Sequence, residues 1–128
     1  MPSRDSKRIL AVVDDLFFSV KISDAAKRAG MEVEFVKSDQ DLLAKATSLP
    51  APALVILDLN FESVGPLGLI RKLKSTGELS KISLIGYLSH VQGELKQKAH
   101  ESGCDMVMAR SAFSQNLPQL LKRHSGSL

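Results

Sequence analysis

The sequence lacks the features that define several classes of protein. Its 128 residues contain one cysteine, Cys104, which excludes a framework of internal disulfides and predicts a reducing compartment. No run of about 18 apolar residues occurs, so we expect no membrane-spanning helix. Residues 1–8 are mainly polar and the apolar stretch behind them stops at Asp14, a pattern unlike that of a secretory signal peptide. Together these absences predict a cytoplasmic protein that does not bind membranes.

The charge of the chain is also modest. The formal net charge is +3, and several of the basic residues lie near the two termini, which is typical of a solvated surface. We therefore expect no direct binding to nucleic acid. A hydrophobic content of 44% and a charged content of 24% are ordinary for a globular domain. The length predicts a single domain over residues 1–128, with a core over about 8–123 and flexible termini.

Five short apolar stretches have the length and composition of β-strands. The first and third are apolar throughout, which is typical of strands buried on both faces of a parallel sheet. The second alternates apolar residues with Glu32 and Glu34, so one of its faces is polar and it is expected at an edge. The five predicted strands cover residues 9–13, 31–36, 53–57, 82–88 and 105–109.

Amphipathic segments with helical spacing separate and follow these strands. Ser38 is expected to cap the second helix, Pro66 to begin the third, and Pro118 to bend or restart the last. The predicted helices cover residues 16–29, 39–48, 66–76, 91–102 and 112–123. Alternating strands and helices predict an α/β fold: a doubly wound, flavodoxin-like five-stranded parallel sheet with strand order 2-1-3-4-5 and five helices.

Polar residues follow or end four of the five strands. They are Asp14 and Asp15 after the first, Asp58 just after the third, Ser89 after the fourth and Arg110 after the fifth. The carboxyl ends of parallel strands meet at one edge of the sheet, so these side chains are expected to share one mouth. Clustered carboxylates repel unless a cation lies among them, and oxygen ligands suit Mg²⁺. A carboxylate there can act as a nucleophile towards a phosphoryl group.

These features make the sequence similar to the receiver domains of two-component response regulators, over residues 8–123. The resemblance is carried by four features: Val12-Val13-Asp14-Asp15, Leu57-Asp58-Leu59-Asn60, Ser89 after the fourth strand, and Gly103 before the fifth.

The resemblance implies a role for each matching residue. Asp58 would accept a phosphoryl group from a histidine kinase or a phosphotransfer protein. Asp15 and Asp58 would ligate Mg²⁺ directly, together with the backbone carbonyl of Asn60. Asp14 would act through a water, and Ser89 would donate a hydrogen bond to a phosphoryl oxygen. The signal would pass to a downstream protein target through the surface around the fourth strand, the fourth helix and the fifth strand.

The chain departs from the family pattern at three places. Arg110-Ser111 replaces the usual lysine and proline after the fifth strand, Val107 replaces the switch aromatic, and His90 replaces a small residue. Arginine and lysine are not interchangeable at a contact with phosphate. Arg110 is expected either to bridge Asp58 or a phosphate bidentately, or to turn into solvent. Tyr87 is a candidate substitute for the missing switch ring.

These departures keep a second hypothesis open, in which the chain is a degenerate receiver that acts as a phosphorylation-independent protein-interaction module. A third hypothesis is another enzyme or a ligand-binding domain on the same sheet. It is opposed by the missing glycine-rich loop after the first strand. A phosphatase would also need an acid where Asn60 stands. We therefore expect a signalling domain whose chemistry is limited to self-phosphorylation from a donor and self-dephosphorylation.

Overall fold

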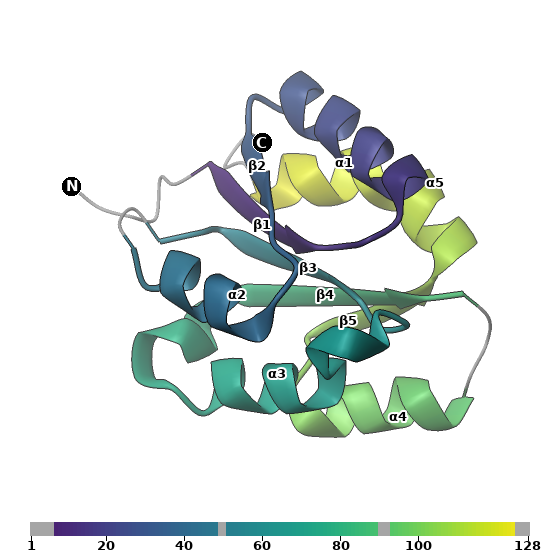
Figure 1. Ribbon diagram of the computed structural model, residues 1–128. Helices are drawn as coiled ribbons and strands as arrows, with labels where there is room; N and C mark the ends of the chain where they lie inside the picture. Colours follow the sequence, from purple (N-terminus) through teal and green to yellow (C-terminus); the bar gives the residue numbers. More distant parts are fainter. Residues whose placement is uncertain (1–6, 49–50, 90–92, 125–128) are drawn as a thin grey trace.

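The computed structural model describes residues 7–48, 51–89 and 93–124 and shows one parallel sheet between two layers of helices (Figure 1). The strand order is β2-β1-β3-β4-β5, and each neighbouring pair is parallel. This is the predicted fold and strand order. The strands are β1 (Arg8–Val12), β2 (Glu32–Phe35), β3 (Leu54–Asp58), β4 (Ser83–Leu88) and β5 (Met106–Ala109).

The helices divide between the two faces of the sheet. Helices α1 (Leu16–Arg28) and α5 (Arg110–His124) cover one face, and α2 (Asp39–Ala46), α3 (Pro66–Lys74) and α4 (Gly93–Ser102) cover the other (Figure 1). Two short 3₁₀ helices, η2 (Glu62–Val64) and η3 (Gly77–Lys81), flank α3 in the chain. None of the helices in the described ranges is long and apolar enough to cross a membrane.

Each face of the sheet has its own apolar core, because successive strand residues point to opposite sides. In β1, Leu10 packs into the core under α2, α3 and α4, whereas Ile9 packs into the core under α1 and α5. In β3, Val55 packs into the core under α2, α3 and α4, and Ile56 packs into the core under α1 and α5. Both cores form because the strand interiors are apolar on both faces, as the sequence predicts.

Several local predictions are confirmed at helix ends. The Ser38 side chain accepts a hydrogen bond from the Asp41 backbone N–H at 3.1 Å and caps α2. Pro66 is the first residue of α3. Gly103 follows α4 with φ +116°, and a Cβ at this position would lie 2.7 Å from the Lys74 side chain. Glycine therefore suits this turn for its backbone conformation and for its lack of a side chain.

The last helix differs from its prediction. It begins at Arg110, two residues earlier than expected, and it continues through Pro118. Proline removes one helical hydrogen bond, at a cost of about 3 kcal/mol or more in an isolated helix. Pro118 lies on the exposed side, while the opposite side buries four large side chains that hold the helix on the sheet. These are Phe113, Leu117, Leu120 and Leu121.

Other predicted boundaries also shift. The segment between β3 and α3, predicted as a loop, contains the 3₁₀ helix η2. Helix α3 ends at Lys74, and Gly77 instead begins η3. His90 and Val91, which the sequence placed before and within the fourth helix, lie outside the described residues.

Candidate functional site

A polar pocket lies at the carboxyl edge of the sheet, where β1, β3 and β5 end. Its position matches the edge predicted from the strand-end residues. Five of its lining residues were named from the sequence: Asp14, Asp15, Asp58, Asn60 and Arg110. The pocket is completed by Phe61, Glu62 and Ser63, which the sequence did not single out and which arrive with the turn into η2.

Asp58 is the last residue of β3 and is half-buried in this pocket. Its Oδ1 accepts a hydrogen bond from the backbone N–H of Asn60 at 2.8 Å. Burial raises the pKa of Asp58 above its ordinary value, and the charges of Asp15 and Asp14 raise it further. The Asn60 N–H and the Arg110 charge oppose this rise without cancelling it. The carboxyl group is therefore more basic than an exposed aspartate.

Asp15 has both carboxylate oxygens in use. As the N-cap of α1, it accepts a hydrogen bond at Oδ1 from the Phe17 backbone N–H, at 2.8 Å. Its Oδ2 accepts a hydrogen bond from Nη2 of Arg110 at 2.6 Å, and the two charges form an ion pair. Aspartate is a favourable N-cap because it satisfies a backbone donor that the helix leaves free. Asp15 thus joins the start of α1 to the start of α5.

Arg110 contacts Asp15 and an aromatic ring, and it neither bridges Asp58 nor turns fully into solvent. Its Cζ lies 4.7 Å from the ring centroid of Phe18, on the face of α1 that packs against the sheet. The Phe18 ring in turn packs against Tyr87, with centroids 4.9 Å apart, and Phe113, at 6.0 Å. Phe18 was not among the residues predicted from the sequence, although its place three residues after an acidic N-cap puts it near the pocket.

Asn60 joins the ends of β3 and β4 through its side chain. Its Oδ1 accepts a hydrogen bond from the Ser89 backbone N–H at 2.7 Å. Only the backbone carbonyl of Asn60 had a role predicted from the sequence, so this side-chain contact is an addition. Ser89 is thereby held beside the pocket, directly after β4.

Asp14 lies on the outer side of the pocket. Its Oδ1 is 3.6 Å from Nζ of Lys37, and both side chains are more than half exposed. An exposed pair at this distance contributes little to stability, about 0–1 kcal/mol. Lys37 follows β2 and supplies a second positive charge at this edge of the sheet, one that the sequence analysis did not predict.

The donor set of the pocket suits a hard divalent cation in its chemistry, because the candidate ligands are all oxygen atoms. In the structure, however, these oxygen atoms are not positioned to bind a cation together. Within the described ranges, no group of three acidic, histidine or cysteine side chains is placed so that it could hold a metal ion. Both oxygens of Asp15 are engaged, and Arg110 holds one of them. A cation bound at Oδ2 of Asp15 would lie next to the positive charge of Arg110.

Tyr87 lies under the pocket and is fully buried. Its ring stacks on Phe113 with centroids 4.8 Å apart. Among the described residues its hydroxyl has no hydrogen-bond partner. Burial, and next the charge of Asp58, raise the pKa of Tyr87 far above its ordinary value, so the hydroxyl stays protonated. A ring packed in this way is part of the core. Val107, at the position of the family's switch aromatic, is also buried, on the opposite face.

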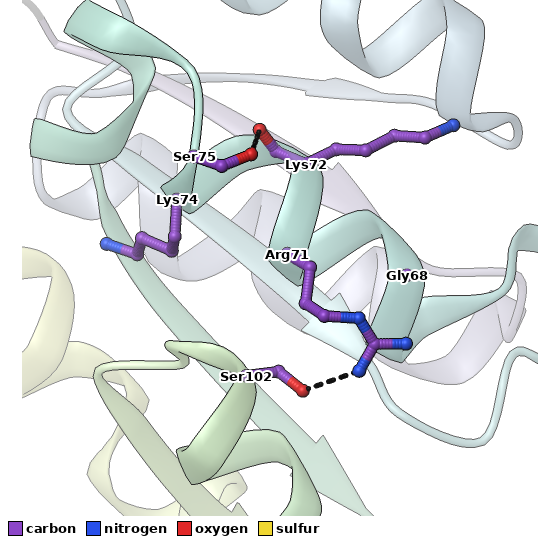
Figure 2. A pocket seen from close by; sticks show the side chains of 6 residues that line it. All are labelled: Gly68, Arg71, Lys72, Lys74, Ser75 and Ser102. Atoms are coloured by element: carbon purple, nitrogen blue, oxygen red, sulfur yellow. Dashed lines mark hydrogen bonds between the residues drawn. The ribbon is translucent and has the colours of Figure 1, made fainter.

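A second surface hollow, between α3 and α4, is basic but structural (Figure 2). Arg71 donates a hydrogen bond to the Ser102 hydroxyl at 3.1 Å and ties the two helices together. Nζ of Lys74 donates a hydrogen bond to Oδ2 of Asp105 at 2.8 Å. Figure 2 shows the side chains of Lys72 and Lys74 directed away from Arg71. The cations therefore do not converge on one point. The lining residues are Gly68, Arg71, Lys72, Lys74, Ser75 and Ser102.

Comparison with known proteins gives matches at the level of structure. No family model and no curated protein sequence matches the chain. The chain resembles a response regulator signal receiver domain from Bermanella marisrubri, with a TM-score of 0.78 and 25% identity, covering 92% of this chain and 97% of that one.

Two further structures show the same likeness. The chemotaxis response regulator CheY4 of Vibrio cholerae gives a TM-score of 0.78 at 20% identity, covering 93% of this chain and 98% of that one. The Mn²⁺-bound form of the response regulator Rcp1 gives 0.72 at 20% identity, covering 94% and 90%. The strand order, the two helical layers and these likenesses agree: the protein has the fold of the receiver domains of response regulators.

Proposed function

We propose that this protein is a phosphorelay receiver that accepts a phosphoryl group on Asp58 from a histidine kinase or a phosphotransfer protein. The observation that carries the proposal is the position of Asp58. It ends the central strand of a receiver fold, half-buried, in a pocket that also holds Asp14, Asp15 and Arg110. A nucleophilic carboxylate needs both access and nearby positive charge to meet a phosphoryl group.

In the proposed reaction a carboxylate oxygen of Asp58 attacks phosphorus. The bond from phosphorus to the donor's nitrogen breaks, and the released nitrogen keeps the electron pair and takes up a proton. The Asn60 N–H holds the other side of the carboxyl group in place. The elevated pKa of Asp58 makes its carboxylate a better nucleophile. Ser89 follows the neighbouring strand β4 and Arg110 follows β5, and both would contact the phosphoryl oxygens.

A divalent cation is part of the proposal. When bound, it would neutralise charge on the transferred group, which is the main requirement of phosphoryl transfer. Asp15, Asp58 and the backbone carbonyl of Asn60 would hold it, with Asp14 acting through a water. The oxygen donors favour Mg²⁺, and the Mn²⁺-bound form of a structural neighbour supports a divalent site.

The proposed partners are proteins. Leu16, Phe17 and Val20 expose large apolar side chains on α1, next to the pocket, at 76%, 63% and 54% of their surface. Exposed apolar residues gathered beside a reactive group favour docking of a protein donor. A downstream target would bind the surface of α4, β5 and α5. We propose that this exchange takes place in the cytoplasm.

The decisive experiment weighs the intact protein after incubation with Mg²⁺ and acetyl phosphate. We expect the mass of one phosphoryl group to be added to the wild type and to Asp24→Asn, which removes an exposed acid of α1 away from the pocket. We expect no addition to Asp58→Asn. An unmodified wild type, across several donors and times, would overturn the proposal.

The second candidate is a degenerate receiver that binds partners without phosphorylation. The specific observation in its favour is the Arg110–Asp15 ion pair, which neutralises the charge of Asp15 without a metal. Val107 adds to it, because a buried valine cannot swing as an aromatic ring does. The same mass measurement separates the two candidates, since the degenerate module would bind its target while its mass stays unchanged.

A further inference from the structure

We propose that Arg110 is a built-in competitor of the divalent cation. Its guanidinium, seated on the Phe18 ring, occupies Oδ2 of Asp15, so that metal binding at Asp15 and the Arg110–Asp15 ion pair exclude one another. The inference deepens the proposed function and rests on its cation site. It gives the unusual arginine a role in the resting protein, separate from any contact with a phosphoryl group.

The first observation is that both carboxylate oxygens of Asp15 already accept a hydrogen bond. Oδ1 is bound by the Phe17 N–H, which the helix cap requires, and Oδ2 is bound by Arg110. An N-cap is maintained as long as α1 keeps its first turn. The oxygen that can change partner is therefore Oδ2. A divalent cation placed on it would meet the guanidinium at close range, where two positive charges repel.

The second observation is that Arg110 is held in place by more than charge. Its guanidinium lies over the face of Phe18, 4.7 Å from the centroid. Phe18 is only 4% exposed and packs against the rings of Tyr87 and Phe113. A planar guanidinium can stack on a ring while it donates to a carboxylate in its own plane. The compact ammonium of a lysine lacks this planar geometry.

The third observation concerns the charges that face one another. Arg110 and the carboxylates of Asp14, Asp15 and Asp58 line the same pocket, and the charge of Arg110 acts on Asp58 directly. Lys37 pairs with Asp14 at the outer side, and both of these side chains are largely exposed. Arg110 and Lys37 therefore differ in position: Arg110 contacts a candidate metal-binding oxygen, and Lys37 lies at the rim of the pocket.

Competition of this kind lowers the apparent affinity for the cation by the fraction of molecules in which Arg110 has released Asp15. The ion pair is partly exposed, with 39% and 33% of the two side chains accessible. A partly exposed ion pair combined with one cation–π contact predicts that releasing Arg110 improves Mg²⁺ affinity roughly 3- to 30-fold.

The experiment titrates Mg²⁺ alone into the full chain and follows binding by calorimetry, without a phosphodonor. We expect Arg110→Gln to bind Mg²⁺ roughly 3- to 30-fold more tightly than the wild type. Lys37→Gln is the matched control, because it also removes one positive charge from the same edge but leaves Asp15 untouched. It should change the affinity less than twofold, as expected for a screened, exposed charge. An equal gain in both variants would reduce the effect to net charge and overturn the inference.

Phe18→Leu is the sharper variant, because it alters no charge. Leucine keeps most of the apolar volume under Arg110 but has no aromatic ring, so the guanidinium loses its cation–π contact. We expect roughly 2- to 5-fold tighter Mg²⁺ binding, from the loss of the cation–π contact. A thermal melt confirms that the variant is folded. If the folded Phe18→Leu variant binds Mg²⁺ with the affinity of the wild type, the claim that the Phe18 ring holds Arg110 on Asp15 is wrong.

A reciprocal measurement completes the test, because two ligands that exclude one another must each weaken the other. Saturating Mg²⁺ should shift the side-chain NMR signals of Arg110 and the ring signals of Phe18 in the wild type. Unshifted signals at saturation would show that the cation binds without displacing Arg110. If no variant binds Mg²⁺, the inference is overturned, whereas acceptance of a phosphoryl group on Asp58 is still decided by mass.

Discussion

Asp58 on β3 and Tyr87 on β4 are register partners in the parallel sheet: Asp58 lines the pocket, and Tyr87 is buried beside it on the neighbouring strand. Residues paired in this way point to the same face. Asp58 is half-buried, and Tyr87 is fully buried with a hydroxyl that finds no partner among the described residues. Both groups cost stability where they stand. The bottom of the pocket is therefore a place where the fold gives up stability, as is common at functional sites.

Replacing Tyr87 by phenylalanine should stabilise the protein. The ring keeps its stacking on Phe113, and the buried, unpartnered hydroxyl is removed. Burying such a group costs about 1–3 kcal/mol, so we expect a gain of about 1 kcal/mol in the free energy of unfolding, measured by chemical denaturation. Tyr87→Leu is the control, because it also loses the stacking and should be less stable than Tyr87→Phe. A clear loss of stability in Tyr87→Phe would reveal a hydrogen-bond partner for the hydroxyl.

Replacing Asp58 by asparagine should stabilise the metal-free protein at neutral pH. The folded pKa of Asp58 is raised above 3.8, so the folded state binds its proton more tightly than the unfolded state does. The wild type is favoured below the ordinary aspartate pKa, and this contribution is lost as the pH rises through the folded pKa.

The expected gain in Asp58→Asn is therefore small at low pH and largest above the folded pKa. If it reaches about 1 kcal/mol, the melting temperature rises by about 3–6 °C. The measurement is a series of melts with a chelator present, from pH 4 to pH 8. A difference between the two proteins that does not change with pH would contradict the raised pKa.

Two substitutions at Asp15 separate its cap from its ion pair. Asp15→Asn keeps an oxygen that can accept from the Phe17 N–H, but loses the charge that holds Arg110. Asp15→Ala loses both contacts. We expect the alanine variant to be less stable than the asparagine variant by about 0.5–2 kcal/mol, the usual value of an N-cap.

The salt dependence of these stabilities tests whether the ion pair and the cap are assigned correctly. Added salt should shrink the difference in free energy of unfolding between the wild type and Asp15→Asn, because it screens a partly exposed ion pair. It should leave the difference between the two variants nearly unchanged. Two variants of equal stability would show that the cap contributes nothing.

Helix α4 should exchange its amide hydrogens faster than the other helices. Its described residues bury only Ala99, with Leu95 partly buried, whereas α1 buries four residues. An element with few buried apolar contacts opens at low free-energy cost. Native-state hydrogen exchange measures this directly, with α1 as the internal comparison. Equal protection of the two helices would remove the argument that α4 belongs to the moving surface.

Local patterns in the sequence were enough to predict the architecture. Strand and helix periodicities depend on neighbouring residues, and the apolar runs that became β1 and β3 are readable without a structure. Once the strands are parallel, their carboxyl ends must meet at one edge, so the gathering of Asp14, Asp15 and Asp58 in one pocket also follows from the sequence. Their roles in metal binding and phosphoryl transfer stay predictions.

Only the tertiary structure decided which side chains pair within that pocket. Arg110 meets Asp15 across 95 residues of sequence and rests on Phe18, and Asn60 uses its side chain to hold the Ser89 N–H. These contacts depend on rotamers and on the exact start of α5, which leave no periodic signal in a sequence. The sequence thus determined that acids and a cation share the edge of the sheet. Three-dimensional packing decided that Arg110 neutralises Asp15, because the guanidinium of Arg110 packs on the ring of Phe18.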